Sequence, residues 1–398
     1  MVPRSESLRL KPGERLDAIS RPAFMANMVV LRSPGEVYLQ GGGPPGGQSV
    51  SWVERIDPVT LEPLARSADL VGGPWWPGGI LAHENGDLYV THGRWCHRLA
   101  PDLSVVTRRQ LPMSHPYNSL LALSDGNLVM KNFVRDGSSR SYLSILQPER
   151  LDIVASSAEV PEGSIARISS DRGARSEFVY VCGDRSIFRF RYENERLTMD
   201  ENWRYRYRTL PPKEQSYAWD PVIAAGYVWF MDNGESVFQR TLRGAGVASG
   251  PVHLHQVSVT DAAGHDMLIP FGASHGTIVN PPVIDPSRKI VIPFDSGNGR
   301  IAAFRFQGLG AYTPLWKRDL GTSNHFILYA ESGELVVNDF DGDTEHVVVL
   351  DIETGSELGR VRTPSALQSL VFQSPGWNRD LYVCTFTTLT RAFVSSGT

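Results

Sequence analysis

The sequence predicts an all-β fold made of repeated four-stranded units. A pattern of apolar strand, tight turn and second apolar strand recurs eight times along the 398 residues. No long stretch repeats its apolar residues with the 3.6-residue period of an amphipathic helix. In addition, 37 Gly and 27 Pro residues supply the turn positions that many short strands require. Four strands in each of eight units predict an eight-bladed β-propeller that forms one domain over residues 1–398, and a seven-bladed ring is the alternative.

The eight predicted inner hairpins follow one another along the chain. Each begins with an apolar strand, turns on residues such as Gly, Asp or Asn, and continues with a strand rich in Val, Tyr and Phe. Their first residues are, in order, Met28, Ile80, Leu120, Ile165, Pro221, Pro281, Phe326 and Ser369. The second strands begin about 40 to 60 residues apart, which is the spacing of propeller blades.

A second hairpin follows most of these pairs and completes each unit. Examples are WVERIDPVTLEPLARSADL from Trp52 and HVVVLDIETGSELGRVRTP from His346. Their alternating polar and apolar residues are typical of strands with one solvated face. The last unit offers only three strands before Thr398. We therefore predict that the N-terminal segment SLRLKPG, residues 7–13, supplies the fourth strand and closes the ring without an open sheet edge.

Two of the outer hairpins share a turn motif. The segment ELVVNDFDGDTEHVVVLDIETGSELGRV begins at Glu334, and its Asp351, Thr354, Leu358 and Arg360 recur at the same offsets as Asp57, Thr60, Leu64 and Arg66. In this motif the Asp caps the turn and Gly355 is able to take a positive φ. The pattern resembles the repeats of the quinoprotein-like (PQQ-like or YVTN-type) β-propellers. The resemblance implies a propeller fold and keeps quinone- or metal-dependent redox chemistry as one functional alternative.

Charge and cysteine content limit the classes of function. The chain has 43 acidic and 39 basic residues and no run of Lys or Arg, so we expect no nucleic-acid partner. The first residues lack the apolar core of a signal peptide and no window approaches 18 uninterrupted apolar residues, so we expect a cytoplasmic protein without membrane contact. The three cysteines, Cys96, Cys182 and Cys384, lie far apart in apolar surroundings and are expected to be buried and unpaired.

Short polar side chains precede most of the predicted inner strands. In a propeller the inner strands begin on one face around the central axis, where the second strands end. The side chains in question are those of Asn27, Asn118, Asp220, Asn280, Asn324 and Gln368, and Lys131 lies at a second-strand end. One interpretation is that they bond the loop backbone and hold each turn into its blade. The other is that they converge on an axial funnel and bind a polar substrate or a divalent cation.

Four of the ten histidines fall at predicted positions on the same face. They are His92, His115, His275 and His325. Converging neutral imidazoles could ligate a metal ion, or one His beside Asp220 could act as a general base. Ordinary hydrogen bonding within loops is the alternative for each of them.

Two further features could enclose such a funnel. Residues 259–276 form a long connection with apolar residues and are a candidate lid, and Trp75 and Trp76 could form an aromatic wall that contacts substrate. Taken together, these residues predict an enzyme that acts on a small molecule, as a lyase, isomerase or hydrolase, with or without a divalent metal ion. A non-catalytic protein-interaction scaffold and a metal- or quinone-dependent oxidoreductase are the alternatives.

Overall fold

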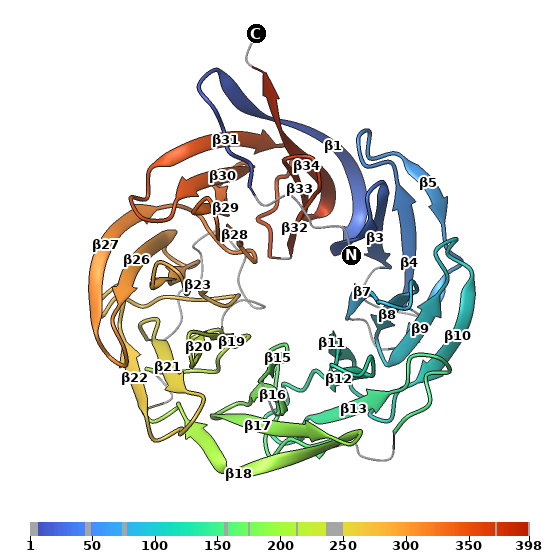
Figure 1. The fold of residues 1–398 in the computed structure, drawn as a ribbon, viewed down its shortest axis with the longest axis horizontal. Coiled ribbons are helices and arrows are strands. Elements are labelled where there is room, and N and C mark those ends of the chain that lie inside the picture. The colour runs from blue at the N-terminus through green and yellow to red at the C-terminus, as the bar shows by residue number, and fades with distance from the viewer. Residues whose placement is uncertain are drawn as a thin grey trace.

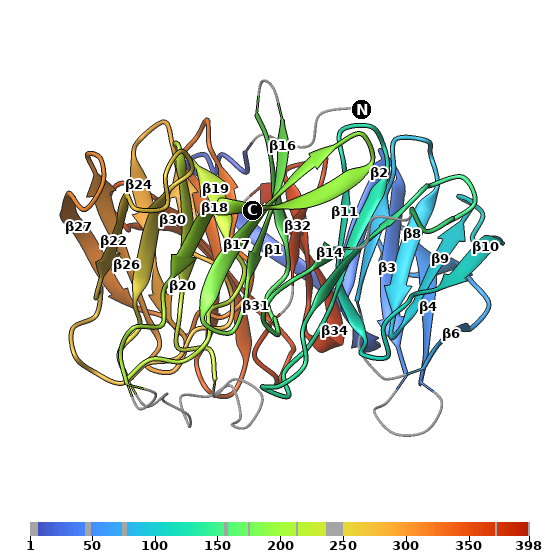
Figure 2. The same ribbon diagram turned by 90° about the horizontal axis from the view of Figure 1, so that it is seen from below.

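The computed structural model confirms an eight-bladed β-propeller, in which eight sheets stand in a ring around a central axis (Figure 1). The structure describes residues 7–43, 49–73, 78–154, 158–173, 176–211, 214–235, 250–370 and 372–396. Every element assigned in these ranges is a strand. Seen from the side, the strands run between the two faces of the ring (Figure 2). Within the described ranges, no helix has the length and apolar character needed to span a membrane.

Each blade is an antiparallel sheet whose strands follow one another outward from the axis. The innermost strands are β2 (Met28–Ser33), β7 (Gly79–Ala82), β11 (Tyr117–Ala122), β15 (Ser169–Arg172), β19 (Val222–Ala224), β23 (Val283–Asp285), β28 (Ile327–Tyr329) and β32 (Gln373–Pro375). The second strands are β3 (Glu36–Gly42), β8 (Leu88–His92), β12 (Leu128–Asn132), β16 (Glu177–Cys182), β20 (Tyr227–Met231), β24 (Ile290–Ile292), β29 (Glu334–Phe340) and β33 (Asp380–Cys384). We number the blades 1 to 8 in this order.

The outer half of each blade completes the sheet. The third strands are β4 (Ser49–Ile56), β9 (Trp95–Leu99), β13 (Tyr142–Leu146), β17 (Ser186–Glu193), β21 (Leu254–Ser258), β26 (Arg300–Phe306), β30 (Glu345–Asp351) and β34 (Phe386–Ser396). The outermost strands are β5 (Pro63–Arg66), β10 (Val105–Gln110), β14 (Ala158–Glu159), β18 (Arg196–Arg206), β22 (His265–Leu268), β27 (Tyr312–Asp319), β31 (Glu357–Thr363) and β1 (Glu14–Ala26). Two short strands add to this pattern: β6 (Leu70–Gly73) pairs with β4, and β25 (Phe294–Asp295) pairs with β26.

An N-terminal strand closes the ring, as expected, but it is not the predicted one. The strand β1 covers Glu14–Ala26 and pairs antiparallel with β34 in blade 8, so the two ends of the chain share one sheet (Figure 1). Residues 7–13, which were predicted to close the ring, form no strand. Instead the backbone N–H of Leu8 donates to Glu334 Oε2 at 2.9 Å in blade 7. Pro22 lies within β1, and an outermost strand tolerates proline because one of its edges needs no ladder hydrogen bonds.

The shared turn motif has the predicted geometry in both outer hairpins. Asp351 Oδ1 accepts hydrogen bonds from the backbone N–H groups of Glu353 and Thr354, at 3.0 and 2.8 Å. Asp57 Oδ1 caps the first blade's turn in the same way. Gly355 takes a φ of 70°. The corresponding residue in blade 1 is Leu61, which is not glycine and still adopts a φ of 66°. The two turns therefore share the same backbone geometry although the residue at this position differs.

The core lies between the faces of neighbouring blades. One cluster joins blades 4 and 5 through Tyr180, Trp203, Tyr205, Phe230 and Val257, all of them buried. Cys96, Cys182 and Cys384 are buried and free of disulfides, as expected for small apolar residues in such layers. Packing of this kind fixes each inner strand by its two neighbours and thereby defines the channel at the axis.

Candidate functional site

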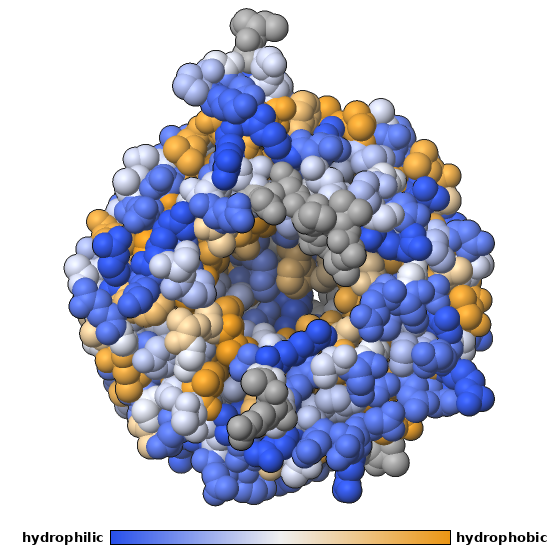
Figure 3. Space-filling model, in the orientation of Figure 1, coloured by the Kyte–Doolittle hydropathy of each residue, from blue (hydrophilic) through white to orange (hydrophobic). Residues whose placement is uncertain are grey.

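An axial cavity of about 340 Å³ lies where the eight inner strands meet. Every blade contributes to its wall, and the space-filling view shows that the molecule is hollowed at the centre of the ring (Figure 3). Most of the wall is apolar, with Met28, Ile80, Leu120 and Val222 among the lining residues. Only a few polar groups interrupt it, which is the usual composition of a small-molecule site.

Three charged or titratable side chains meet at this cavity. Asp220 precedes β19, Arg167 precedes β15, and His325 precedes β28. Asp220 Oδ1 accepts the backbone N–H of Arg167 at 2.6 Å, which fixes the carboxylate. Asp220 Oδ2 lies 3.5 Å from Arg167 Nη1 and 3.5 Å from His325 Nε2. Residues from blades 4, 5 and 7 therefore converge on one carboxylate.

Phe372 holds the other two side chains in place. The ring of His325 stacks on that of Phe372, with 4.1 Å between centroids and an interplanar angle of 18°. The guanidinium carbon of Arg167 lies 4.5 Å from the centre of the Phe372 ring, a cation–π contact. An isolated parallel bridge also joins the backbones of His325 and Phe372. These contacts restrict the rotamers of the imidazole and of the guanidinium.

Burial keeps the His325 imidazole neutral. Burial, assisted by the positive charge of Arg167, holds the pKa of His325 well below its usual range. Its Nε2 atom and the Nε atom of Arg167 are buried, and neither has a hydrogen-bond partner among the described residues. Buried polar atoms normally find partners, so these two atoms are unsatisfied positions beside the cavity. The arrangement can accept a proton at the imidazole and stabilise the resulting cation with Asp220.

Lys131 is fully buried near the end of β12 and is not among the residues that line the axial cavity. Its Nζ donates to the carbonyl oxygens of Asn132 and Ser164, at 2.9 and 3.0 Å. Burial lowers the pKa of Lys131 to about 7, although Asp220 opposes part of this shift. A neutral amine has two N–H groups, which match these two acceptors. The hydrogen bonds of Lys131 thus join blade 3 to the connection that leads into blade 4.

Four of the five predicted amide residues bond neighbouring blades together, and the fifth, Asn27, is bonded within blade 1. Asn118 donates to the Ile165 carbonyl at 2.6 Å, Asn280 to the Ser323 carbonyl at 2.5 Å, and Gln368 to the Gly321 carbonyl at 2.8 Å. Asn324 accepts from Gln373 Nε2 at 2.9 Å, and Asn27 is buried with its backbone N–H bonded to Gln40. Of these five residues, Asn118 lines the axial cavity.

The four predicted histidines are placed in different surroundings, and among them His325 alone lines the axial cavity. His92 is fully buried against Gly72, where a Cβ atom would come within 2.0 Å of the imidazole. His115 is half-exposed, with its Nε2 atom 3.4 Å from Asp136. His275 is exposed, and its carbonyl accepts from Asn298 at 2.6 Å. Among the described residues, the lining of the axial cavity therefore does not bring several histidines together.

Two further predictions from the sequence concern the tryptophan wall and the candidate lid. Trp75 and Trp76 lie outside the described residues. Part of the candidate lid at residues 259–276 is the outermost strand β22 (His265–Leu268), which pairs with β21. A covering role for this segment remains a prediction.

Sequence reasoning missed Arg167 and Phe372, and it also missed a second Asp–His group in blade 5. Asp232 is fully buried, and its two oxygens contact His253 Nδ1 at 2.7 Å and His255 Nε2 at 3.0 Å. Gln215 donates to Asp232 Oδ2 at 2.6 Å. The signal was the His-x-His spacing, since residues two apart in a strand share a face.

No group of three or more His, Cys, Asp or Glu side chains is arranged to hold a metal ion in the part of the chain that the structure describes. A divalent metal ion therefore remains a prediction from the sequence.

Comparison with known proteins agrees with the fold. No protein-family model matches the chain, and no curated protein matches it. Among solved structures it is similar to the Dos1 propeller, at 11% identity and a TM-score of 0.62, over 94% of this chain and 93% of that chain. It is also similar to apo AztD from Citrobacter koseri, at 13% identity and a TM-score of 0.50, over 86% of this chain and 87% of the other. At such identities the likeness shows a β-propeller and nothing finer, and the quinoprotein-like resemblance stays a prediction.

Proposed function

We propose that this propeller is an enzyme that binds a small molecule in its axial cavity and acts on it by acid–base chemistry. The observation that carries the proposal is the meeting of His325, Asp220 and Arg167 on an apolar cavity of about 340 Å³. His325 accepts a proton from the substrate or from a water molecule, and Asp220 stabilises the imidazolium that forms. Arg167 pairs with an anionic group of the substrate. Proton removal from carbon leads to a lyase or isomerase, and proton removal from water leads to a hydrolase.

The apolar wall supports a limited range of substrates. Apart from the three charged or titratable residues, the cavity is lined mainly by apolar residues, with Asn118, Ser119 and Ser169 as its other polar residues. A suitable substrate therefore has an apolar body and one anionic group. A highly charged or extensively hydroxylated molecule would leave polar groups unpaired against the aliphatic wall, at a cost of about 1–3 kcal/mol for each group.

The test is turnover of small molecules from a cell extract by the purified protein, followed by mass spectrometry. We expect the wild-type protein to deplete at least one carboxylate-bearing compound and to form a product, and we expect His325→Gln and Asp220→Asn to lose this turnover while keeping the wild-type melting temperature. Arg150→Ala is a matched control because Arg150 is 85% exposed and lies outside the axial cavity.

The same experiment separates the competing functions. Turnover that persists in both axial variants would refute the proposed site. Turnover that requires an added divalent metal would favour the metal-assisted form, and activity tied to a bound chromophore would favour the oxidoreductase. A protein that binds and converts no small molecule would favour the interaction scaffold.

A further inference from the structure

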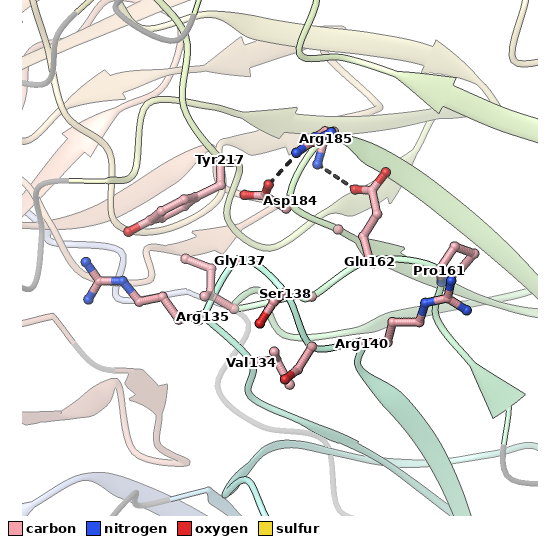
Figure 4. Close-up of a pocket in the computed structure, with 14 residues that line it drawn as sticks. Val134, Arg135, Gly137, Ser138, Arg140, Pro161, Glu162, Asp184, Arg185 and Tyr217 are labelled. Carbon is pink, nitrogen blue, oxygen red and sulfur yellow. Dashed lines mark hydrogen bonds and ion pairs between the residues drawn. The ribbon is translucent and has the colours of Figure 1, made fainter.

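A second cavity, which we call the side cavity, opens between blades 3 and 4 and has a volume of about 380 Å³. Its wall is formed by the loop after β12, the connection to blade 4, the turn after β16, and Tyr217 from the connection to blade 5 (Figure 4). Unlike the axial cavity, it is lined by three arginines, Arg135, Arg140 and Arg185. Figure 4 shows Arg135 and Arg140 on opposite sides of the cavity, with Arg185 on a third side.

The two carboxylates of the wall already accept hydrogen bonds from neighbouring backbone and side-chain groups. Glu162 Oε2 accepts the backbone N–H groups of Arg185 and Ser186, at 2.6 and 3.0 Å, and Glu162 Oε1 accepts Arg204 Nη2 at 3.3 Å. Asp184 Oδ1 accepts Arg208 Nη1 at 3.0 Å. Arg204 and Arg208 therefore largely compensate the negative charge of Glu162 and Asp184. The three arginines of the wall then leave the lining with a net positive charge.

The arginines of the wall remain accessible. The side chain of Arg185 is 63% exposed, and its charged partner is Asp184 at 3.7 Å, beyond hydrogen-bond distance. The side chain of Arg140 is 56% exposed, and it contacts Glu159. Arg135 lies beside the hydroxyl group of Tyr217, which donates to the Glu235 carbonyl at 3.2 Å. Guanidinium groups in such positions can reorient toward a ligand and bind an oxyanion through two N–H groups.

The loop that forms the floor is held in one conformation without a ligand. Asp136 Oδ1 accepts the backbone N–H groups of Ser138 and Ser139, at 2.9 and 2.6 Å, and Gly137 takes a φ of 74°. The backbone N–H of Val134 donates to Ser164 at 3.0 Å, which ties the loop to blade 4. A pocket whose floor is already ordered loses little conformational entropy when a ligand binds.

From these contacts we infer that the side cavity binds a small molecule carrying a phosphate or carboxylate group, with the oxyanion held by Arg135 and Arg185 and the remainder of the ligand along the ring of Tyr217. This site is separate from the proposed catalytic site. The connection from blade 3 to blade 4 nevertheless contributes Gly163 to the side cavity and Arg167 to the axial cavity.

Isothermal titration calorimetry with inorganic phosphate and with citrate, at constant ionic strength set by sodium chloride, tests the inference. We expect at least one of the two anions to bind, and we expect the double variant Arg135→Ala/Arg185→Ala to weaken that binding at least tenfold. The matched control is Arg108→Ala/Arg150→Ala, which removes two exposed arginines that line neither cavity, and it should bind within twofold of the wild type.

Each outcome decides the inference. Binding of phosphate alone assigns a phosphorylated ligand, and binding of citrate alone assigns a carboxylate. Lack of binding by both anions overturns the proposal, as does equal binding by the wild type and the Arg135/Arg185 variant. Binding that survives in that variant but is lost in Arg167→Ala would place the anion in the axial cavity instead. Thermal melting of each variant shows whether it remains folded.

Discussion

Two aspartate–histidine groups flank the inner hairpin of blade 5, and they differ in how tightly the histidines are bonded to the aspartate and in how deeply they are buried. Asp220 precedes β19, and Asp232 follows β20. His325 lies 3.5 Å from Asp220, keeps 17% of its side chain exposed, and has a buried Nε2 atom without a hydrogen-bond partner among the described residues. His253 and His255 are fully buried and both hydrogen-bond to Asp232, at 2.7 and 3.0 Å, although His253 Nε2 also has no hydrogen-bond partner among the described residues.

This difference indicates which of the two aspartate–histidine groups can take part in a reaction. The oxygens of Asp232 are bonded to both histidines and to Gln215, and His255 Nδ1 also meets the hydroxyl group of Tyr205 at 3.2 Å. Burial alone would raise the pKa of Asp232, but the hydrogen bonds from the two histidines outweigh burial and hold that pKa below its ordinary value. A group bonded in this way stabilises blade 5. The looser group at the axis can exchange its contacts for those of a substrate.

The largest effect is expected at the axial group. His325→Gln and Asp220→Asn should each lower turnover by about 10²–10⁴-fold, because they remove the general base or the carboxylate that supports it. The free energy of unfolding should change by less than about 1 kcal/mol, since Asn still accepts the Arg167 backbone N–H. Turnover measured beside urea denaturation checks both parts. A large loss of stability in Asp220→Asn would show that the two groups are equivalent.

The opposite result is expected in the buried group. Asp232→Ala leaves two buried histidines and Gln215 without their shared acceptor. We expect the free energy of unfolding to fall by about 3–5 kcal/mol, as for other broken buried pairs. Chemical denaturation measures this loss. If the variant is as stable as the wild type, the hydrogen bonds of Asp232 make no net contribution to the free energy of unfolding.

A third buried carboxyl extends the comparison to an acid without a histidine partner. Glu345 is fully buried at the start of β30, where it accepts Asn338 Nδ2 at 3.1 Å and the backbone N–H of Ser369. Burial raises the pKa of Glu345 to about 8. The folded state therefore binds this proton more tightly than the unfolded state does. The contribution of Glu345 to the free energy of unfolding is fully present below the unfolded-state pKa, and it is lost as the pH rises toward 8.

The expected slope for this single group is at most about 1.4 kcal/mol per pH unit, between roughly pH 5 and 8. Glu345→Gln removes the titration, and the difference in unfolding free energy between wild type and variant should change with pH by that amount. Urea denaturation from pH 5 to 9 measures it. A difference that stays constant with pH would mean that Glu345 titrates normally.

The smallest effect is expected at the edge of the buried group. Tyr205→Phe removes one hydrogen bond to His255 while keeping the ring that packs in the core of blades 4 and 5. We expect a loss of about 1 kcal/mol in the free energy of unfolding. A loss as large as that of Asp232→Ala would show that the hydroxyl group, rather than the carboxylate, organises the two histidines.

Much of the fold could be predicted because each blade repeats the same local signals. Alternating apolar strands and turns on Gly or Asp mark all eight blades, and the Asp57 and Asp351 turns have the expected hydrogen bonds. The closing strand was placed wrongly because Pro22 and the polar residues of β1 do not look like a strand. Only its position at the outer edge of blade 8, a tertiary property, makes that sequence acceptable.

The candidate site could be predicted only in part. Asp220 and His325 were expected on one face from their positions before inner strands, and the structure brings these two together. Arg167 and Phe372 could not be found, because an arginine and a phenylalanine near apolar strands look like ordinary blade residues. Their roles arise from contacts between blades 4, 7 and 8 that lie far apart in the sequence.

The pairing of β1 with β34 also determines when the ring can form during synthesis. Glu14 pairs with Ser396, and Ala26 pairs with Phe386. Residues 14–26 are made before every other strand of the ring, and their partners in β34 are made after every other strand. The first blades can fold while the later ones are still being made, but blade 8 must wait until β34 is made, so residues 14–26 lack their native partner while the other seven blades are synthesised.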